Sequence, residues 1–308
     1  MKRTAFFASL SPWGKLFLLL GLIFVFAIAF ALAGLVAGML IYGISLTEIS
    51  GFINNPNTPQ AIAFLKFYQV INQVGIFVLP VLVYSFLVSS SSFEYLSLKR
   101  VPKLISLLLG GIVMYSILPF NNYLDELNHQ INFPDFLSGL EDWIIFKEEQ
   151  ARELTIIFLK ANTISGLLLN IFVVAIVPAI GEELLFRGVL IKLLNSFFKN
   201  IHFAVLFSAI IFSAIHIQFY GFFPRMLLGL ILGYLFVYTS NIWIPIFAHF
   251  VNNASSVLIY YLYSNGSINV SMDEFGTSSN IVYIIGSLLI TGWLMMMIYQ
   301  KEGADRIL

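Results

Sequence analysis

Residues 166–188 read GLLLNIFVVAIVPAIGEELLFRG. The run 166–177 is uncharged, and the following stretch contains Glu182, Glu183 and Arg187. An uncharged run of this kind is typical of a membrane span, and an ionisable side chain at the centre of a span costs about 2.5–3.5 kcal/mol. Such groups usually face the interior of a helical bundle and have a function. The stretch therefore predicts both a membrane fold and a buried polar site.

The composition of the whole chain supports the membrane class. The 308 residues are 59% hydrophobic and 10% charged, with a mean hydropathy of +0.91. Soluble domains carry roughly 25% charged residues, so this chain has too few charges to cover a soluble surface. The net charge is zero and no basic arm is present, which argues against nucleic acid as a partner. The absence of cysteine excludes disulfides, thiol catalysis and thiolate metal sites.

Apolar runs long enough to cross a bilayer predict an all-α, polytopic membrane protein of about eight transmembrane helices in one bundle, with a catalytic cavity inside the membrane. The predicted spans are 15–43, 64–90, 103–121, 163–187, 201–217, 222–239, 242–263 and 279–299. The first apolar run continues to about Tyr42, longer than the roughly 7–15 apolar residues of a signal peptide, so we expect an uncleaved span. Two small-residue pairs, Gly34/Gly38 and Gly229/Gly233, allow close helix packing or reflect only the frequency of glycine in membrane helices.

The distribution of charge predicts the orientation. Eight spans place both termini on one side of the membrane, and that side collects most of the basic residues: Lys2, Arg3, Lys15, Lys99, Arg100, Lys103, Lys192, Lys199, Lys301 and Arg306. Its acidic residues are Glu94, Glu302 and Asp305, whereas the opposite loops are rich in acidic residues. By the positive-inside rule, both termini are expected in the cytoplasm.

The polar stretch 122–160 has apolar faces and is expected to lie along the outer membrane interface, with a small extramembrane cap as the alternative. We divide the chain into N-terminal helices with this segment, residues 1–160, and a catalytic core, residues 161–308. The two parts are expected to form one structural unit, and no internal repeat is visible.

Helical spacing separates the three charged groups. Glu183 and Arg187 are four residues apart, on one helical face and in the favourable order for an ion pair. Glu182 lies about 100° around the helix and has no local partner. A desolvated carboxylate without a partner can serve as a general base. The alternative is a buried charge network that only fixes helix packing.

Two histidines in later spans are candidates for the same site as Glu182. Glu182 and His216 each lie 17 residues from Lys199 in the link between two spans, so both sit about 25 Å from the tip of a helical hairpin and can face each other. Phe212, one turn before His216, could shield the site from lipid. His249 and Asn253 share one face of the seventh span.

Prolines precede two of these groups by four residues. Pro178 precedes Glu182, and Pro245 precedes His249. A proline inside a helix frees a carbonyl one turn earlier, and a membrane helix tolerates this where protein groups take up the carbonyl. The spacing therefore indicates two broken helices beside the site, or two ordinary kinks.

Three short motifs of this sequence resemble those of one known family. Glu182-Glu183-xxx-Arg187, Phe212-xxx-His216 and His249-xxx-Asn253 are similar to the motifs of the CAAX protease and bacteriocin-processing (CPBP) family of intramembrane proteases. The resemblance covers residues 165–260, and the eight-helix architecture of the family resembles the predicted count. It implies hydrolysis of a peptide bond within the membrane. By residue, it implies that Glu182 with His216 activates water, that His249 and Asn253 stabilise the oxyanion, and that Glu183 and Arg187 orient the site.

The resemblance leaves the need for a metal open. Glu182, His216 and His249 form a possible zinc set, but the helical His-Glu-x-x-His spacing is absent, and we expect catalysis that requires no cofactor. The expected partners are the bilayer and a membrane-associated protein or peptide, either a CAAX-type prenylated tail or a leader or bacteriocin-type peptide. A proton-coupled transporter and a non-catalytic scaffold or immunity protein are the alternatives. The sequence does not indicate an oligomeric state.

Overall fold

The structure, a computed structural model, describes residues 4–54, 56, 58–131 and 133–302. The chain is 79% helix, and the described residues contain no strand, which confirms the predicted all-α class. Four of the charges used to predict the orientation, Lys2, Arg3, Asp305 and Arg306, lie outside the described residues.

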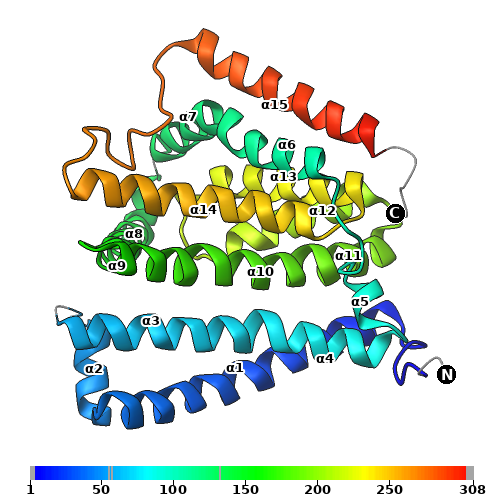
Figure 1. Ribbon diagram of the computed structural model, residues 1–308, viewed down its shortest axis with the longest axis horizontal. Helices are drawn as coiled ribbons and strands as arrows, with labels where there is room; N and C mark the ends of the chain where they lie inside the picture. The colour runs from blue at the N-terminus through cyan, green and yellow to red at the C-terminus, as the bar shows by residue number, and fades with distance from the viewer. Residues whose placement is uncertain (1–3, 55, 57, 132, 303–308) are drawn as a thin grey trace.

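A helix occupies each of the eight predicted spans (Figure 1). The first two are α1 (Pro12–Tyr42) and the continuous run α3 (Pro59–Gln73), η1 (Val74–Val78) and α4 (Leu79–Val88). The third is α6 (Leu104–Ser116), which is followed, after a bend of 40°, by α7 (Leu118–His129). The last three are α13 (Phe222–Thr239), α14 (Trp243–Ser264) and α15 (Ile281–Lys301). Short helices α2 (Leu46–Asn54) and α5 (Ser92–Tyr95) connect the early spans.

Five of the described helices are long and apolar enough to cross a membrane, or six if the bent pair counts as one span. The two remaining predicted spans correspond to α12 (Ile201–Ala214) and α14. Helix α12 is short, and α14 contains His249, Asn252 and Asn253, which lower its hydropathy. The structure therefore agrees with about eight helices, with the polar residues of the site lowering the apolar signal of one of them.

The fourth span is longer than the sequence predicts. It runs from Ile164 to Phe198 through α9 (Ile164–Asn170), η3 (Ile171–Ile176), α10 (Val177–Glu183), η4 (Leu184–Leu190) and α11 (Ile191–Phe198). The predicted end at 187 is therefore wrong by eleven residues. The helix continues because Ile191 and Leu193 pack into the apolar core, and it ends at Lys199, which adopts a left-handed conformation.

The polar stretch 122–160 is largely helical. After the end of α7 it contains the short turn η2 (Asp135–Leu137) and the 22-residue helix α8 (Ser138–Leu159). In Figure 1, α8 is seen nearly along its axis, whereas α1, α10 and α14 run across the view. A helix that crosses the direction of the spans is compatible with the predicted position along the membrane interface.

Close packing at glycine joins neighbouring spans. A Cβ atom at Gly38 of α1 would lie 2.3 Å from the Phe64 ring of α3, and one at Gly233 of α13 would lie 2.8 Å from Val205 of α12. Both positions therefore need glycine for the helices to approach. The structure supports the packing interpretation of both small-residue pairs.

The described ends of the chain lie at the same end of the bundle. The start of α1 and the end of α15 are both on the right in Figure 1, as an even number of crossings requires. This geometry agrees with eight spans, and the side of the membrane on which the ends lie stays a prediction.

Candidate active site

The three charged residues of the first motif lie where the long fourth span changes its winding. Glu182 and Glu183 end α10, and Arg187 lies in η4, a segment with π-helical hydrogen bonding. Segments of π-helix are rare and occur frequently at functional sites. All three side chains are buried.

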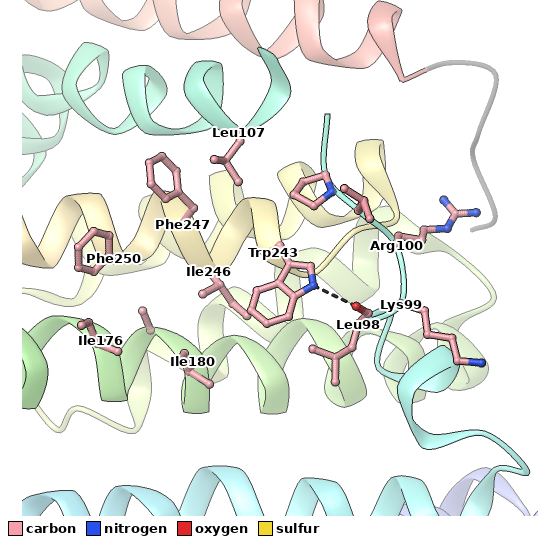
Figure 2. Close-up of a pocket in the computed structure, with 13 residues that line it drawn as sticks. Leu98, Lys99, Arg100, Leu107, Ile176, Ile180, Trp243, Ile246, Phe247 and Phe250 are labelled. Atoms are coloured by element: carbon pink, nitrogen blue, oxygen red, sulfur yellow. Dashed lines mark hydrogen bonds between the residues drawn. The ribbon is translucent and has the colours of Figure 1, made fainter. Parts of the chain in front are cut away.

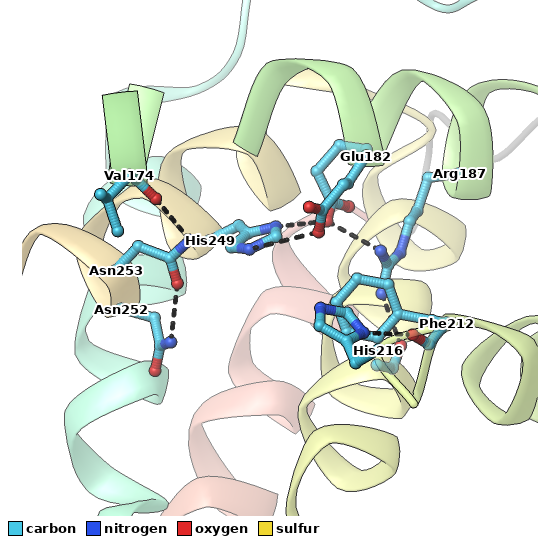
Figure 3. Close-up of polar contacts among 10 residues, drawn as sticks. Val174, Glu182, Arg187, Phe212, His216, His249, Asn252 and Asn253 are labelled. Atoms are coloured by element: carbon cyan, nitrogen blue, oxygen red, sulfur yellow. Dashed lines mark hydrogen bonds and ion pairs between the residues drawn. The ribbon is translucent and has the colours of Figure 1, made fainter. Parts of the chain in front are cut away.

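Pro178 breaks the hydrogen-bond pattern just before these residues, as predicted. The carbonyl of Val174, four residues earlier, cannot be bonded by the proline nitrogen. Asn253 of α14 takes up this carbonyl, with its Nδ2 donating to Val174 O at 3.2 Å (Figure 3). The break therefore ties α14 to the fourth span.

Pro245 does not break a helix, and that prediction is wrong. Helix α14 begins at Trp243, so Pro245 lies in its first turn. The backbone N–H groups of a first turn have no partner within the helix, so proline costs no hydrogen bond there.

Glu183 connects two of the predicted site residues. Its Oε1 accepts hydrogen bonds from Arg187 Nη1 at 2.7 Å and from His249 Nδ1 at 2.8 Å. The predicted ion pair of Glu183 with Arg187 is thus present, while the bond to His249 was not predicted. Arg187 Nη2 also donates to the carbonyl of Gly229, which fixes the guanidinium against α13.

The orientation of the His249 ring follows from this contact. A carboxylate only accepts hydrogen bonds, so Nδ1 carries the proton and Nε2 points the other way, toward Glu182. The distance from His249 Nε2 to Glu182 Oε2 is 3.9 Å, too long for a direct hydrogen bond. Figure 3 shows His249 between the Glu182 and Asn253 side chains.

His216 lies two residues beyond the end of α12 and is held by the main chain. Its Nδ1 donates to the carbonyl of Phe212 at 2.8 Å, which leaves Nε2 as an acceptor in the neutral ring. The Phe212 ring makes edge contacts with both His216 and His249, and the Arg187 guanidinium lies 5.0 Å from its centre. Phe212 therefore packs among the site residues, and its predicted role in shielding the site from lipid stays a prediction.

One cavity of about 170 Å³ brings the predicted groups together. Its lining residues are Met114, Glu182, Phe212, His216, Arg225, Leu228, Leu232, His249, Asn252 and Asn253. The described side chains of Glu182 and His216 share this cavity without a direct hydrogen bond to each other. Glu183 and Arg187 lie behind it. We call this space the reaction cavity.

Known proteins share the part of the chain that forms this cavity. Residues 164–255 match the family described as type II CAAX prenyl endopeptidase Rce1-like. This segment is Rce1-like. A protein of Bacillus subtilis (strain 168) named "Putative membrane peptidase YdiL" is 30% identical over 127 residues, which is 41% of this chain and 51% of that protein. The match thus covers about half the length of this relative, and no solved structure matches the chain.

The comparisons confirm the resemblance that the motifs predicted, and they support an integral membrane peptidase at the level of the family. The Rce1-like segment contains all three motifs, from Glu182 to Asn253. The individual role of each site residue stays a prediction.

The sequence did not indicate every residue at the site. Arg225, in the first turn of α13, reads as a charge at the end of a span but lines the reaction cavity. Gln73 of α3, outside the Rce1-like segment, has its side-chain amide beside the Glu182 carboxylate. Neither residue belongs to a motif, and only the folded chain brings Arg225 to the cavity and Gln73 to the Glu182 carboxylate.

A larger cavity, of about 500 Å³, lies away from these groups. It is mostly apolar and is lined by α10 and α14 residues such as Ile180 and Phe247, with Lys99 and Arg100 at one end (Figure 2). The Trp243 indole N–H donates to the carbonyl of Leu98 and holds the ring in its wall. None of its described lining residues is a carboxylate or histidine, so the smaller cavity is the better candidate for an active site.

The arrangement does not form a metal cage. Across the described ranges, no three His, Cys, Asp or Glu side chains are grouped so that they could hold a metal ion together. Glu182, His216 and His249 line one cavity, but they do not converge on a common point as the zinc alternative requires. We therefore derive no step through a metal.

Proposed function

We propose that the protein is an intramembrane endopeptidase that hydrolyses a peptide bond by glutamate-activated water. The observation that carries this proposal is the reaction cavity. Glu182 of α10, His216 after α12 and His249 of α14 come from three parts of the chain to one enclosed space. A carboxylate and two imidazoles in such a space are the groups that proton transfer to and from water requires.

In the proposed reaction, Glu182 removes a proton from a water molecule, with His216 Nε2 accepting the second hydrogen of that water as a hydrogen bond. The water oxygen bonds to the carbonyl carbon of the scissile peptide, and the carbonyl electron pair moves to the oxygen. When the C–N bond breaks, Glu182 returns the proton to the leaving nitrogen. The products are a new carboxyl group and an amine, and Glu182 is regenerated.

The oxyanion of the intermediate would be stabilised from α14. The Nε2 of His249 can donate to it when the ring is protonated, and the Glu183 carboxylate at Nδ1 holds the ring in the orientation that this requires. Asn253 gives one N–H to Val174 and retains a second. Donors aimed at developing charge in a site with little water are among the strongest contributions to catalysis.

The positions of Glu183 and Arg187 support an orienting role. Both are buried behind the cavity, and their ion pair fixes the carboxylate that holds His249. Arg187 balances the charge of Glu183, while Glu182 lies 3.9 Å from His249 Nε2 and stays available to the cavity. We propose that the reaction needs no metal ion.

The proposed substrates are membrane-associated proteins or peptides, either CAAX-type prenylated tails or leader and bacteriocin-type peptides. The family match and the placement of the cavity among apolar helices support this class. We further propose that both termini lie in the cytoplasm, as the charge distribution predicts.

Cleavage by the purified, reconstituted protein tests this function. A pool of membrane-embedded and prenylated peptides is offered, and products are identified by mass spectrometry. Glu182→Gln removes the base and should slow cleavage by roughly 100- to 10,000-fold without loss of folding. Glu153→Gln, the same change at an exposed position of α8, is the matched control and should cleave like the parent.

A parallel cleavage assay with a zinc chelator tests whether the reaction needs a metal ion. Cleavage by the parent should persist when a strong zinc chelator is present. Loss of cleavage with the chelator, restored by added zinc, would contradict the metal-free reaction, and equal cleavage by parent and Glu182→Gln would refute the assigned base.

A further inference from the structure

Two cavities meet at the link between α5 and α6, away from the reaction cavity. The larger is the apolar cavity of about 500 Å³ in Figure 2, and beside it lies a polar cavity of about 310 Å³. Arg100 and Val101 line both of them. A single ligand with an apolar part and a polar part can therefore occupy the two cavities together.

The apolar cavity is suited to a hydrocarbon chain. Ile180 of α10 and Phe247 of α14 belong to its facing walls, and Leu107 of α6 also lines it. Its volume is within the roughly 300–1,000 Å³ of ligand sites. Trp243, which is 39% exposed, lies in the wall toward Lys99 and Arg100. Tryptophan is enriched at the level of lipid headgroups, so the chain end of a lipid would lie deeper and its headgroup near Arg100.

The polar cavity offers positive charge and the starts of two helices. Arg100 and Lys103 line it, and α6 begins at the residue after Lys103. Asn241 also lines it, two residues before the start of α14, and its Nδ2 donates to the carbonyl of Arg100. The N-terminus of a helix favours an anion, and arginine matches a phosphate in geometry and charge. The polar cavity is therefore suited to a phosphate group.

The carboxylates of this region balance only part of its positive charge. Glu302 lines the polar cavity, where its Oε2 lies 3.2 Å from Lys103 Nζ and its Oε1 accepts from Ser106. The Lys99 ammonium pairs in the same way with Glu94 at 2.7 Å. Three cations, at positions 99, 100 and 103, and two carboxylates, at 94 and 302, leave a net charge of +1 among these residues. A ligand with one negative charge complements it.

We propose that the two cavities together bind one anionic phospholipid, with an acyl chain between α10 and α14 and the phosphate group at Arg100. Basic pockets between membrane helices on the cytoplasmic side are suited to anionic headgroups, and the proposed orientation places Arg100 on that side. The inference does not depend on the peptidase function, because the site shares no lining residue with the reaction cavity.

The first test compares two lipids on the unmodified, purified full-length protein. Phosphatidylglycerol and phosphatidylcholine with the same acyl chains are titrated in detergent, and bound lipid is counted by native mass spectrometry. Phosphatidylglycerol should bind roughly fivefold to thirtyfold more tightly, the preference that one or two basic side chains provide. Equal affinity for the two lipids overturns the proposal without any variant.

Variants then assign the preference to the polar cavity. Arg100→Gln should lose most of the preference for phosphatidylglycerol. Lys199→Gln is the matched control, because Lys199 is an exposed cation on the same side of the bundle, outside both cavities, and should retain the preference. A melting curve of each variant shows that it is folded. A full preference in Arg100→Gln, or an equal loss in Lys199→Gln, overturns the assignment.

Competition tests whether the ligand needs both parts. The probe sn-glycerol 3-phosphate carries the anion without a chain, and geranylgeraniol carries a long apolar chain without an anion. Neither should displace phosphatidylglycerol at equal concentration. Displacement by the first would show a site for a free phosphate, and displacement by the second would show a site selective for the chain alone. Either result overturns the assignment to a phospholipid.

A last pair of variants places the acyl chain. Ile176→Trp adds bulk to the wall of the apolar cavity and should weaken both phospholipids alike, by roughly fivefold to hundredfold, without changing the preference between them. Leu168→Trp, at a position of the same span that is 61% exposed and outside the cavity, is the matched control and should bind both lipids like the parent. Unchanged binding by Ile176→Trp, or equal weakening by the two variants, overturns the placement of the chain.

Discussion

The contact of α1 with α3 and the contact of the fourth span with α13 and α14 hold membrane helices together in different ways. In the first half, α1 packs on α3 through Gly34 and Gly38, which lie against the rings of Tyr68 and Phe64. In the second half, the charged groups Glu183 and Arg187 are buried at the centre and joined to α13 and α14. The first arrangement combines close packing with hydrogen bonds such as that from Tyr42 Oη to the Ala63 carbonyl, and the second also places groups that can move protons.

The difference indicates where a membrane protein can accept polar residues. Helices in lipid associate through close van der Waals contact, for which small residues suffice. Buried ions are costly and are retained where they have a function. The contrast therefore assigns packing to the first half and chemistry to the second.

The largest expected effect on stability is at Arg187. Arg187→Leu removes the partner of a carboxylate that is fully buried, and breaking a buried ion pair in this way costs about 3–5 kcal/mol in the free energy of unfolding. Thermal and denaturant unfolding in detergent measures this. The matched control is Arg152→Leu, which breaks an exposed pair with Asp273 and should cost about 0–1 kcal/mol. Equal effects of the two changes would show that the buried charges contribute no more than exposed ones.

A smaller effect is expected from glycine packing in the first half. Gly38→Ala places a methyl group against the Phe64 ring and should lower the free energy of unfolding by about 1–3 kcal/mol. Gly21→Ala, in the same helix, meets no atom within 4 Å and should change it by about 0.5 kcal/mol or less. The variant Gly38→Ala should retain the cleavage rate of the folded parent. A folded but inactive Gly38→Ala protein would contradict the division between packing and chemistry.

Much of the fold could be predicted from the sequence because each span is a local property. Apolar runs and their limits determine α1, α13 and α15 to within a few residues. The end of the fourth span was wrong because the helix continues where side chains such as Ile191 pack against neighbouring helices. Packing of that kind depends on the tertiary structure, which a local pattern does not contain.

The candidate site shows the same limit. The ion pair of Glu183 with Arg187 follows from helical spacing, and the Val174 carbonyl freed by Pro178 follows from the chemistry of proline. The bond from His249 to Glu183 joins residues 66 positions apart, and no spacing rule predicts it. Residues in no motif, such as Arg225, could be recognised only from the cavity that they line.

Gln73 tests whether the chemistry is confined to the second half of the chain. It belongs to α3, yet its side-chain amide lies beside the Glu182 carboxylate, the proposed base. A polar contact between a neutral amide and the base contributes about 0.5–1.5 kcal/mol, so Gln73→Leu should lower kcat by roughly 3- to 10-fold and leave KM unchanged.

The matched control is Gln69→Leu, one turn earlier on α3. Gln69 and Gln73 line the same groove against α8, but only Gln73 lies beside Glu182 among the described residues of α3. Steady-state kinetics at several pH values, together with unfolding of each variant, separates a positioning role from a structural one. A fall in kcat and an altered pH profile in Gln73→Leu alone would extend the site into the first half of the chain. The same small loss of stability in both variants, with kcat unchanged, would restrict the chemistry to the Rce1-like segment, because Gln73 would then contribute packing in the same way as Gly38.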